Sequence, residues 1–351
     1  MLFQKPKIIY PKDNKNKEIF IKIKKILYEE KFQKDIIDEY AIILSNENEI
    51  IGVIGRYLNN LRCLVIQPKY RNYNFANILI DFMIKRIYKN NFKEVFVFTK
   101  SINCKIFKNL GFKIIYSNDE FSFLTNRYDI FTQYLEYLKQ EKEENNNNSA
   151  IVMNANPLTK GHEHLIKTAS QNSDFVYIIM VSEEGSLFTY KERLDMVKLV
   201  TQNYNNIKVV EGSNYLVSKN VFPSYFLSSK EEVIKKQIIL DSFIFVTHIA
   251  SVLNIKKRFV GEEPFSFTTN LYNQIMKDIF QKQGIELVIL PRLRYKDKAI
   301  SATQARKLFI NSKFEQIAEI VPISSLNYLK NLNPEKYKEN KKLLSLVDKN
   351  N

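Results

Sequence analysis

The stretch Ile151–His164, IVMNANPLTKGHEH, decides the fold of the half of the chain that follows it. Its apolar start, Ile151 to Met153, is typical of a buried strand, and the Asn-Ala-Asn-Pro that follows is typical of a turn. A helical pattern of apolar residues then begins at Leu165. A strand that passes through a turn into a helix is the place where an open α/β sheet binds phosphate-bearing ligands. Backbone N–H groups at the helix start favour an anion there.

Two of the 3 histidines of the chain lie in this stretch. A lone histidine is usually structural, but His162 follows Gly161 at a helix start, and this context favours contact with a phosphate. His162 and His164 are two residues apart, so they do not share a helix face, and zinc helices use a spacing of four. We therefore expect no metal site built from protein side chains.

A second cluster of hydroxyl and basic side chains lies at 300–306, ISATQAR. Ser301 with Gln304 three residues later is typical of a helix N-terminal cap. The same geometry points Ser301, Thr303 and, one turn later, Arg306 at an anion bound to the helix start. Both interpretations can hold together. Arg292 and Arg294 precede the cluster and add two cations.

The chain divides into three parts by composition. Residues 1–140 predict one α/β unit of order βββαβαβ, and the polar run EKEENNNNS at 141–149 predicts a linker, since it has nothing to bury. In residues 150–351 strands alternate with helices, which predicts an α/β fold with a doubly wound parallel sheet, followed by short C-terminal helices. The expected strands of this part are 150–153, 175–181, 207–211, 258–260 and 285–290, with an extended segment at 222–227 and a long helix at 231–253.

Charge and cysteine content bound the class of protein. The 351 residues carry 53 Lys and Arg against 38 Asp and Glu, a net charge of +15. This charge suits an anionic substrate or an acidic partner, although lysine is abundant throughout, and we expect no nucleic-acid binding. Cys63 and Cys104 form no metal spacing and no disulfide framework. Without a leader-like N-terminus or an uninterrupted apolar span, we expect a cytoplasmic protein with no membrane segment.

The first part resembles the acetyltransferase fold of the GNAT family. The likeness lies in two segments, VIQPKYRNYNFA at 65–76 and NCKIFKNLGF at 103–112. In that family the loop before the helix binds the pyrophosphate of acetyl-CoA. Here Asn74 replaces its first glycine, and Ala76 fits the second. We interpret the domain as a retained structural or docking module, with an N-acetyltransferase as the alternative.

The two clusters of the second part, TxGH early and ISxTxxR late, resemble the nucleotidyltransferase superfamily, which binds ATP across the switch point of a parallel sheet. Further segments are similar to the family of citrate (pro-3S)-lyase ligases, also called acetate:citrate-lyase ligases. These segments are SLFTYKERLDMV, FPSYFL, RFVGEEPFSFTTNLYN and RLRYKDKAISATQAR, and the family also carries a GNAT-like domain in front. Leu158 stands where the family usually has Phe.

The resemblance implies a ligase that forms a carbon–sulfur bond. ATP, with Mg²⁺, and acetate give acetyl-adenylate and pyrophosphate. The thiol of a phosphopantetheine-type prosthetic group on the acyl carrier subunit of citrate lyase then attacks the acetyl carbon and releases AMP. Acyl carrier proteins are acidic, so the basic surface has a matching partner.

The resemblance also implies roles for individual residues. His162 and Arg306 are expected to be catalytic, with His162 stabilising charge on the triphosphate. The expected ATP-binding residues are Asn154, Thr159, Gly161, His162, Gly261, Glu262, Ser301, Thr303 and Arg306. Arg193 and Arg294 are candidates for acetate or phosphates, or else for salt bridges.

Two alternative functions stay open. The first is an adenylyltransferase of the same fold that acts on a phosphopantetheine or nicotinate-type substrate and leaves a nucleotidylated product. The second is a non-catalytic regulator that binds ATP and uses the first domain for interaction.

Overall fold

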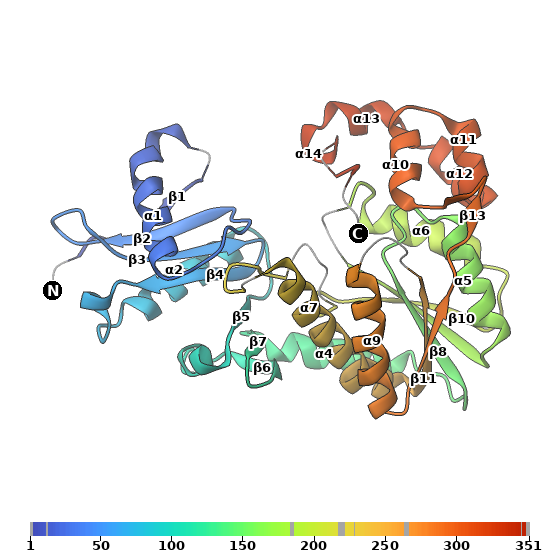
Figure 1. Cartoon of the computed structure of the whole chain (residues 1–351), viewed down its shortest axis with the longest axis horizontal. Coiled ribbons are helices and arrows are strands. Elements are labelled where there is room, and N and C mark those ends of the chain that lie inside the picture. Colours follow the sequence, from blue (N-terminus) through green and yellow to red (C-terminus); the bar gives the residue numbers. More distant parts are fainter. Residues whose placement is uncertain are drawn as a thin grey trace. The chain divides into compact units, whose positions relative to one another are not determined.

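The computed structural model describes the chain except residues 1–2, 12, 183–185, 217–221, 228, 263–266, 345 and 349–351. It forms two compact units (Figure 1). The first contains Met1–Gln133 and Asn220–Lys236, and the second contains Tyr134–Lys219 and Gln237–Asn351. The predicted α/β class is confirmed in both units.

The first unit is built on a seven-stranded sheet of order β1-β2-β3-β4-β5-β7-β6. The pair β4–β5 is parallel, and the other pairs of the described sheet are antiparallel. Besides the expected elements, the sheet contains β1 and β7, and helices α1 and α4 flank it in sequence, all of which sequence reasoning missed. The elements are β1 Lys7–Ile9, α1 Lys17–Glu29, β2 Glu39–Leu44, β3 Ile50–Tyr57, β4 Asn60–Ile66, α2 Phe75–Lys89, β5 Phe96–Lys100, α3 Cys104–Lys108, β6 Lys113–Ser117 and β7 Phe121–Thr125. The boundary between the two units falls within α4 Tyr128–Gln140, after Gln133.

The segment 222–227, expected in the second domain, packs in the first unit instead. β4 and β5 pair at only two positions, beyond which the backbone of β5 needs other partners. The hydroxyl of Tyr225 donates to the carbonyl oxygen of Phe98 in β5 at 3.2 Å. The ring of Phe222 lies 5.1 Å from that of Phe98. Aromatic burial in this sheet, rather than the strand–helix alternation around it, therefore places the segment.

The second unit contains a five-stranded sheet of order β10-β9-β8-β11-β12, and all its pairs are parallel. The strand order reverses direction between β8 and β11, so the switch point of the doubly wound sheet lies between these two strands. The elements are β8 Asn148–Met153, α5 Lys160–Gln171, β9 Phe175–Met180, α6 Tyr190–Thr201, β10 Ile207–Glu211, β11 Ile255–Gly261, α9 Phe267–Lys282, β12 Glu286–Leu290, β13 Arg294–Tyr295, β14 Lys298–Ala299, α10 Ala302–Ile310, α11 Phe314–Ile320, α12 Ile323–Lys330, α13 Pro334–Glu339 and α14 Lys341–Leu344. The boundary between the two units falls within α7 Lys230–Ile244, after Lys236.

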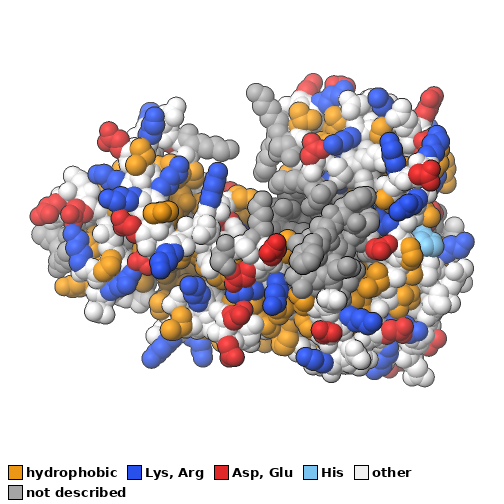
Figure 2. Space-filling view, viewed as in Figure 1, with side chains coloured by type: hydrophobic (Ala, Val, Ile, Leu, Met, Phe, Trp, Pro, Cys, Tyr) orange, Lys and Arg blue, Asp and Glu red, His pale blue; other side chains and the backbone are white. Residues whose placement is uncertain are grey.

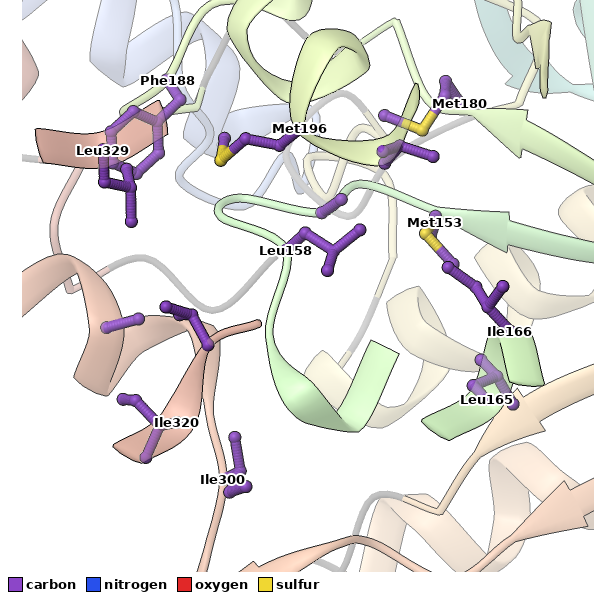
Figure 3. Close-up of a cluster of buried hydrophobic side chains, with 14 of the residues drawn as sticks. Met153, Leu158, Leu165, Ile166, Met180, Phe188, Met196, Ile300, Ile320 and Leu329 are labelled. Atoms are coloured by element: carbon purple, nitrogen blue, oxygen red, sulfur yellow. The ribbon is translucent and has the colours of Figure 1, made fainter. Parts of the chain in front are cut away.

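Alternation along β11 shows that helices cover both faces of this sheet. Phe259 joins the apolar cluster of Figure 3, which is formed with α5, α6 and the C-terminal helices. The neighbouring Arg258 stacks over Phe245 and Phe280, at 4.4 and 5.6 Å, on the opposite face. Leu158, in the turn after β8, is fully buried and points into the cluster (Figure 3). The core thereby fixes the turn that leads into α5.

The predicted linker overlaps β8 by two residues, whereas the predicted long helix is confirmed and contains a π-helical segment. Asn148 and Ser149 lie in β8 and are fully buried, because the parallel ladder starts earlier than their polarity suggests. The expected helix 231–253 is interrupted by a π-helical segment, Phe245–Ala250, between α7 and α8 Ser251–Leu253. Glu231–Leu253 is long and apolar enough to cross a membrane, but 56% of its most apolar window is buried within the protein. A core helix meets the same criteria, so this is weak support for a span.

Candidate active site

The predicted site lies at the carboxyl end of β8, beside the switch point. Residues 154–159 form the turn from β8 into α5, and Gly261 ends the neighbouring parallel strand β11. The backbone N–H of Glu262 donates to Leu290 at the end of β12, at 2.7 Å. Because parallel strands end at the same sheet edge, the turn, Gly261 and Glu262 share that edge. Residues 263–266, the next part of the FVGEEPF motif, lie outside the described residues.

Thr159 and His162 close a capping box at the start of α5. The backbone N–H of Thr159 donates to Nδ1 of His162 at 3.0 Å, and the Thr159 hydroxyl lies 3.0 Å from the same nitrogen. Burial, together with the positive charge of Arg292, lowers the pKa of His162 to about 4. At neutral pH the imidazole is therefore uncharged and, since Nδ1 accepts, carries its proton on Nε2. His162 is thus a fixed, neutral hydrogen-bond donor at a helix N-terminus.

Gly161 leaves space at the same helix start. Among the described residues outside its own helix backbone, a Cβ built on it would meet only the Thr159 hydroxyl within 4 Å, at the ordinary distance of 3.6 Å. The protein itself therefore does not require glycine here. The open surface above Gly161 suits the close approach of a ligand to the first N–H groups of α5.

Two fully buried arginines donate hydrogen bonds to the turn between β8 and α5. Arg193 of α6 donates to the backbone oxygen of Asn154 at 2.9 Å, to its side-chain oxygen, and to Val181 at 3.0 Å. Arg306 of α10 donates to the carbonyl oxygen of Asn156 at 2.6 Å. It also donates to Val347 at 2.9 Å. The turn is thus anchored to α6, α10 and the C-terminal segment.

These contacts bear on the roles predicted for three residues. Arg306 is 1% exposed and Arg193 is 0% exposed, so neither presents its guanidinium to a ligand in this conformation. Burial lowers the pKa of Arg306 to about 10, and the residue still carries its charge at neutral pH. Thr159 is buried, and its hydroxyl contacts Nδ1 of His162 in the cap. In this conformation the polar atoms of all three residues make backbone or cap contacts, and their predicted contacts with ligands stay predictions.

The start of α10 keeps part of its predicted geometry. Ser301 is the N-cap, and its hydroxyl accepts from the backbone N–H of Gln304 at 3.1 Å. The Thr303 hydroxyl accepts from Nη2 of Arg306 at 2.9 Å. Both residues are only partly buried. The N-terminus of α10 is therefore a second helix start that can take an anion.

The remaining basic residues separate into two groups. Lys160 donates to the carbonyl oxygens of Ala318 and Glu319, at 2.9 and 3.0 Å, and so stabilises the end of α11 instead of facing the site. Arg294 is exposed on the β13–β14 hairpin. Arg292 lies close enough to His162 to influence its pKa. Of the two arginines before the 300–306 cluster, the structure thus brings Arg292 to His162, although Arg294 was the predicted candidate.

Ser186 belongs to the site but was missed in the sequence. Its hydroxyl lies 3.2 Å from Nδ2 of Asn154. The segment SLFTY that it begins was noted only as part of a resemblance. Among the described residues, no group of three or more His, Cys, Asp or Glu side chains is placed to hold a metal ion.

The comparisons with known proteins match both parts of the chain. The citrate lyase ligase C-terminal domain matches residues 148–329, and the acetyltransferase (GNAT) domain matches residues 12–125. The citrate [pro-3S]-lyase ligase of Escherichia coli K12 is 32% identical over 327 residues, which cover 92% of this chain and 93% of that protein. That of Haemophilus influenzae is 32% identical over 314 residues, 88% of this chain and 94% of that protein.

A shorter segment of the chain is similar to an enzyme with a different name. A phosphopantetheine adenylyltransferase of Clostridium botulinum (strain Langeland) is 41% identical over 63 residues, which cover 17% of this chain and 38% of that protein. This match is confined to a small part of both proteins, whereas the ligase relatives align along nearly their whole length. The family predicted from the sequence is confirmed, and the chain belongs to the citrate lyase ligase family.

Proposed function

We propose that the protein uses ATP and acetate to acetylate the prosthetic-group thiol of the acyl carrier subunit of citrate lyase. The observation that carries the chemistry is the neutral His162, whose Nε2–H is fixed at the N-terminus of α5 beside the switch point. The observation that carries the substrates is membership of a family whose relatives are named for this lyase.

The reaction has two steps. An acetate oxygen attacks the α-phosphorus of ATP, and pyrophosphate leaves with the electron pair of the broken P–O bond. The prosthetic-group sulfur then attacks the acetyl carbon of acetyl-adenylate, the thiol proton is lost, and AMP leaves. Neither step needs a covalent protein nucleophile, so positioning and charge stabilisation supply the catalysis.

The triphosphate is proposed to bind between two helix starts. The N–H groups of α5 above Gly161, the Nε2–H of His162 and the guanidinium of Arg292 face one side of it. Ser301 and Thr303, at the start of α10, face the β- and γ-phosphates, and Arg306 positions Thr303 rather than touching the nucleotide. A neutral imidazole donates to developing charge without a large desolvation cost.

The nucleoside is proposed to lie over the ends of β8 and β11. Asn154 lines the cleft, and Gly261 and Glu262 lie where adenine or ribose would rest. Among the described residues, leaving out its chain neighbours, no atom lies within 4 Å of a Cβ built on Gly261, which leaves room for a base. Arg294, which is exposed, is a candidate for the acetate carboxylate or a phosphate.

Mg²⁺ is proposed to arrive with ATP. Mg²⁺ is usually held by substrate phosphates and few carboxylates, and such a mode suits a site rich in donors rather than acceptors. When bound, the ion would neutralise charge on the phosphates. The residues named above bind and orient the nucleotide with or without that contribution.

The partner is proposed to be acidic, and the location cytoplasmic. The net charge of +15 would speed encounter with an acidic carrier. On the face drawn in Figure 2, Lys and Arg side chains are spread among Asp and Glu rather than gathered in one patch. This distribution suits a small acidic protein better than the long track of phosphates in a nucleic acid.

The direct test supplies ATP, Mg²⁺, acetate and the carrier subunit in its thiol form. We expect AMP, pyrophosphate and acetylated carrier in equal amounts, and acetyl-hydroxamate when hydroxylamine replaces the carrier. An adenylyltransferase that acts on phosphopantetheine is the second candidate, favoured by the 63-residue similarity. It would instead leave a nucleotidylated product and form no hydroxamate.

A further inference from the structure

A cavity of about 480 Å³ is lined in part by Ser186, whose side chain contacts Asn154 of the candidate active site. One wall is the segment Ser186–Tyr190, which precedes α6, and the other comes from the C-terminal helices α13 and α14. Its lining is mainly apolar and aromatic and includes Phe188, Tyr337 and Leu343. Pockets of this size and character hold linear organic ligands rather than bare phosphate.

The wall of this cavity is joined to the turn that binds the nucleotide. The Ser186 hydroxyl lies 3.2 Å from Nδ2 of Asn154. Two residues later, the backbone N–H of Phe188 donates to Oδ1 of Asn156 at 3.2 Å. The wall of the cavity is therefore hydrogen-bonded to the turn at the proposed nucleotide site.

The opposite wall is fixed by a contact between α13 and α6. The Tyr337 hydroxyl donates to Oε1 of Glu192 at 2.7 Å, and its ring lies 5.7 Å from the ring of Phe188. Glu192 also closes the capping box of α6 with Thr189. Residues at the start of α6 therefore contact both walls and fix the shape of the cavity.

The cavity has few polar side chains besides its tyrosines, namely Ser186, Thr189 and Lys336. Lys336, at the cavity, is exposed and adds positive charge there.

We propose that this cavity receives the thiol-bearing, amide-containing arm of the acyl carrier partner and delivers its sulfur to the acyl-adenylate. This inference rests on the proposed function. Acetate is too small to fill the cavity, and its charge finds no buried cation in the lining. A long arm suits the mainly apolar walls, and the exposed Lys336 suits an acidic carrier around it.

The test compares two leucines of the same helix, α14. Leu343 lines the cavity, whereas its neighbour Leu344 is 44% exposed. Leu343→Trp is expected to fill the cavity and slow acetyl transfer to the carrier, or to free pantetheine, by at least tenfold. Acetate-dependent exchange of pyrophosphate into ATP, which needs no carrier, is expected to stay within twofold of the unaltered protein. Leu344→Trp is expected to change neither reaction.

Lys336→Glu is a second variant, and because Lys336 is exposed we expect it not to affect folding. It is expected to raise the KM for the carrier severalfold at low salt, with less effect at high salt and none on free pantetheine. Transfer at the normal rate in Leu343→Trp, or an equal loss of exchange and transfer, would overturn the assignment. Absence of acetate-dependent exchange in the unaltered protein would instead refute the proposed function itself, and the assignment with it.

Discussion

The sharpest prediction concerns His162, whose two ring nitrogens have separate tasks. Nδ1 accepts the Thr159 N–H in the capping box, and Nε2–H is the proposed donor to the phosphates. Asparagine places Oδ1 where Nδ1 lies and has no atom that reaches as far as Nε2. His162→Asn should therefore keep the cap and remove only the donor.

The expected magnitudes separate the two tasks. With the cap retained, the free energy of unfolding should change by less than about 0.5 kcal/mol, whereas His162→Ala should cost about 1 kcal/mol. Loss of a donor to developing charge should slow acetyl-adenylate formation by about 10²–10³ in both variants. Pyrophosphate exchange and urea denaturation measure the two quantities.

His164→Asn is the matched control, because His164 is exposed on the same helix. It should leave both quantities unchanged. A normal exchange rate in a folded His162→Asn protein would refute the role of Nε2. A large loss of stability in the same variant would refute the interpretation of the cap.

Four further predictions follow from the same structure. The pKa of His162 is about 4 in the folded protein, against 6.5 for an ordinary histidine, so between these pH values the unfolded chain binds a proton that the native protein does not. The free energy of unfolding, measured by denaturation, should therefore fall by up to about 3 kcal/mol from pH 6.5 to pH 4. The fall should be smaller in His162→Asn. Gly161→Ala should raise the free energy of unfolding by up to about 1 kcal/mol, yet weaken ATP binding measured by calorimetry. An unchanged affinity for ATP would contradict a close approach of the nucleotide to the start of α5. Arg306→Ala should lower unfolding free energy by about 2–4 kcal/mol and activity with it, whereas full stability with lost activity would restore a direct phosphate role. Tyr225→Phe should cost about 1 kcal/mol and slow no step of catalysis, as denaturation and steady-state kinetics would establish, whereas a slowed turnover would show that the segment 222–227 acts in the reaction.

Sequence reasoning succeeded where the signal is local. The strand, turn and helix of residues 151–164 follow from adjacent residues, and the cap at Ser301 follows from its spacing to Gln304. The alternation of strands and helices was enough to predict a parallel sheet, and the sheet order then places the switch point at β8 and β11.

Sequence reasoning could not identify the distant partners of individual side chains. Arg306 carries the composition of a phosphate ligand, but its partner Asn156 is 150 residues away and buried with it. Arg193 is similar, since its backbone acceptors lie at the ends of two strands. The segment 222–227 joins the first unit through rings that no sequence pattern connects. Long-range packing, which local periodicity does not encode, decides each of these cases.

The central claim is that the site activates a carboxylic acid as its adenylate. Exchange of labelled pyrophosphate into ATP, measured with and without acetate and in the absence of any thiol, tests it most directly. The account predicts exchange that requires acetate and is lost in His162→Asn. Exchange that ignores acetate and instead requires phosphopantetheine would contradict it.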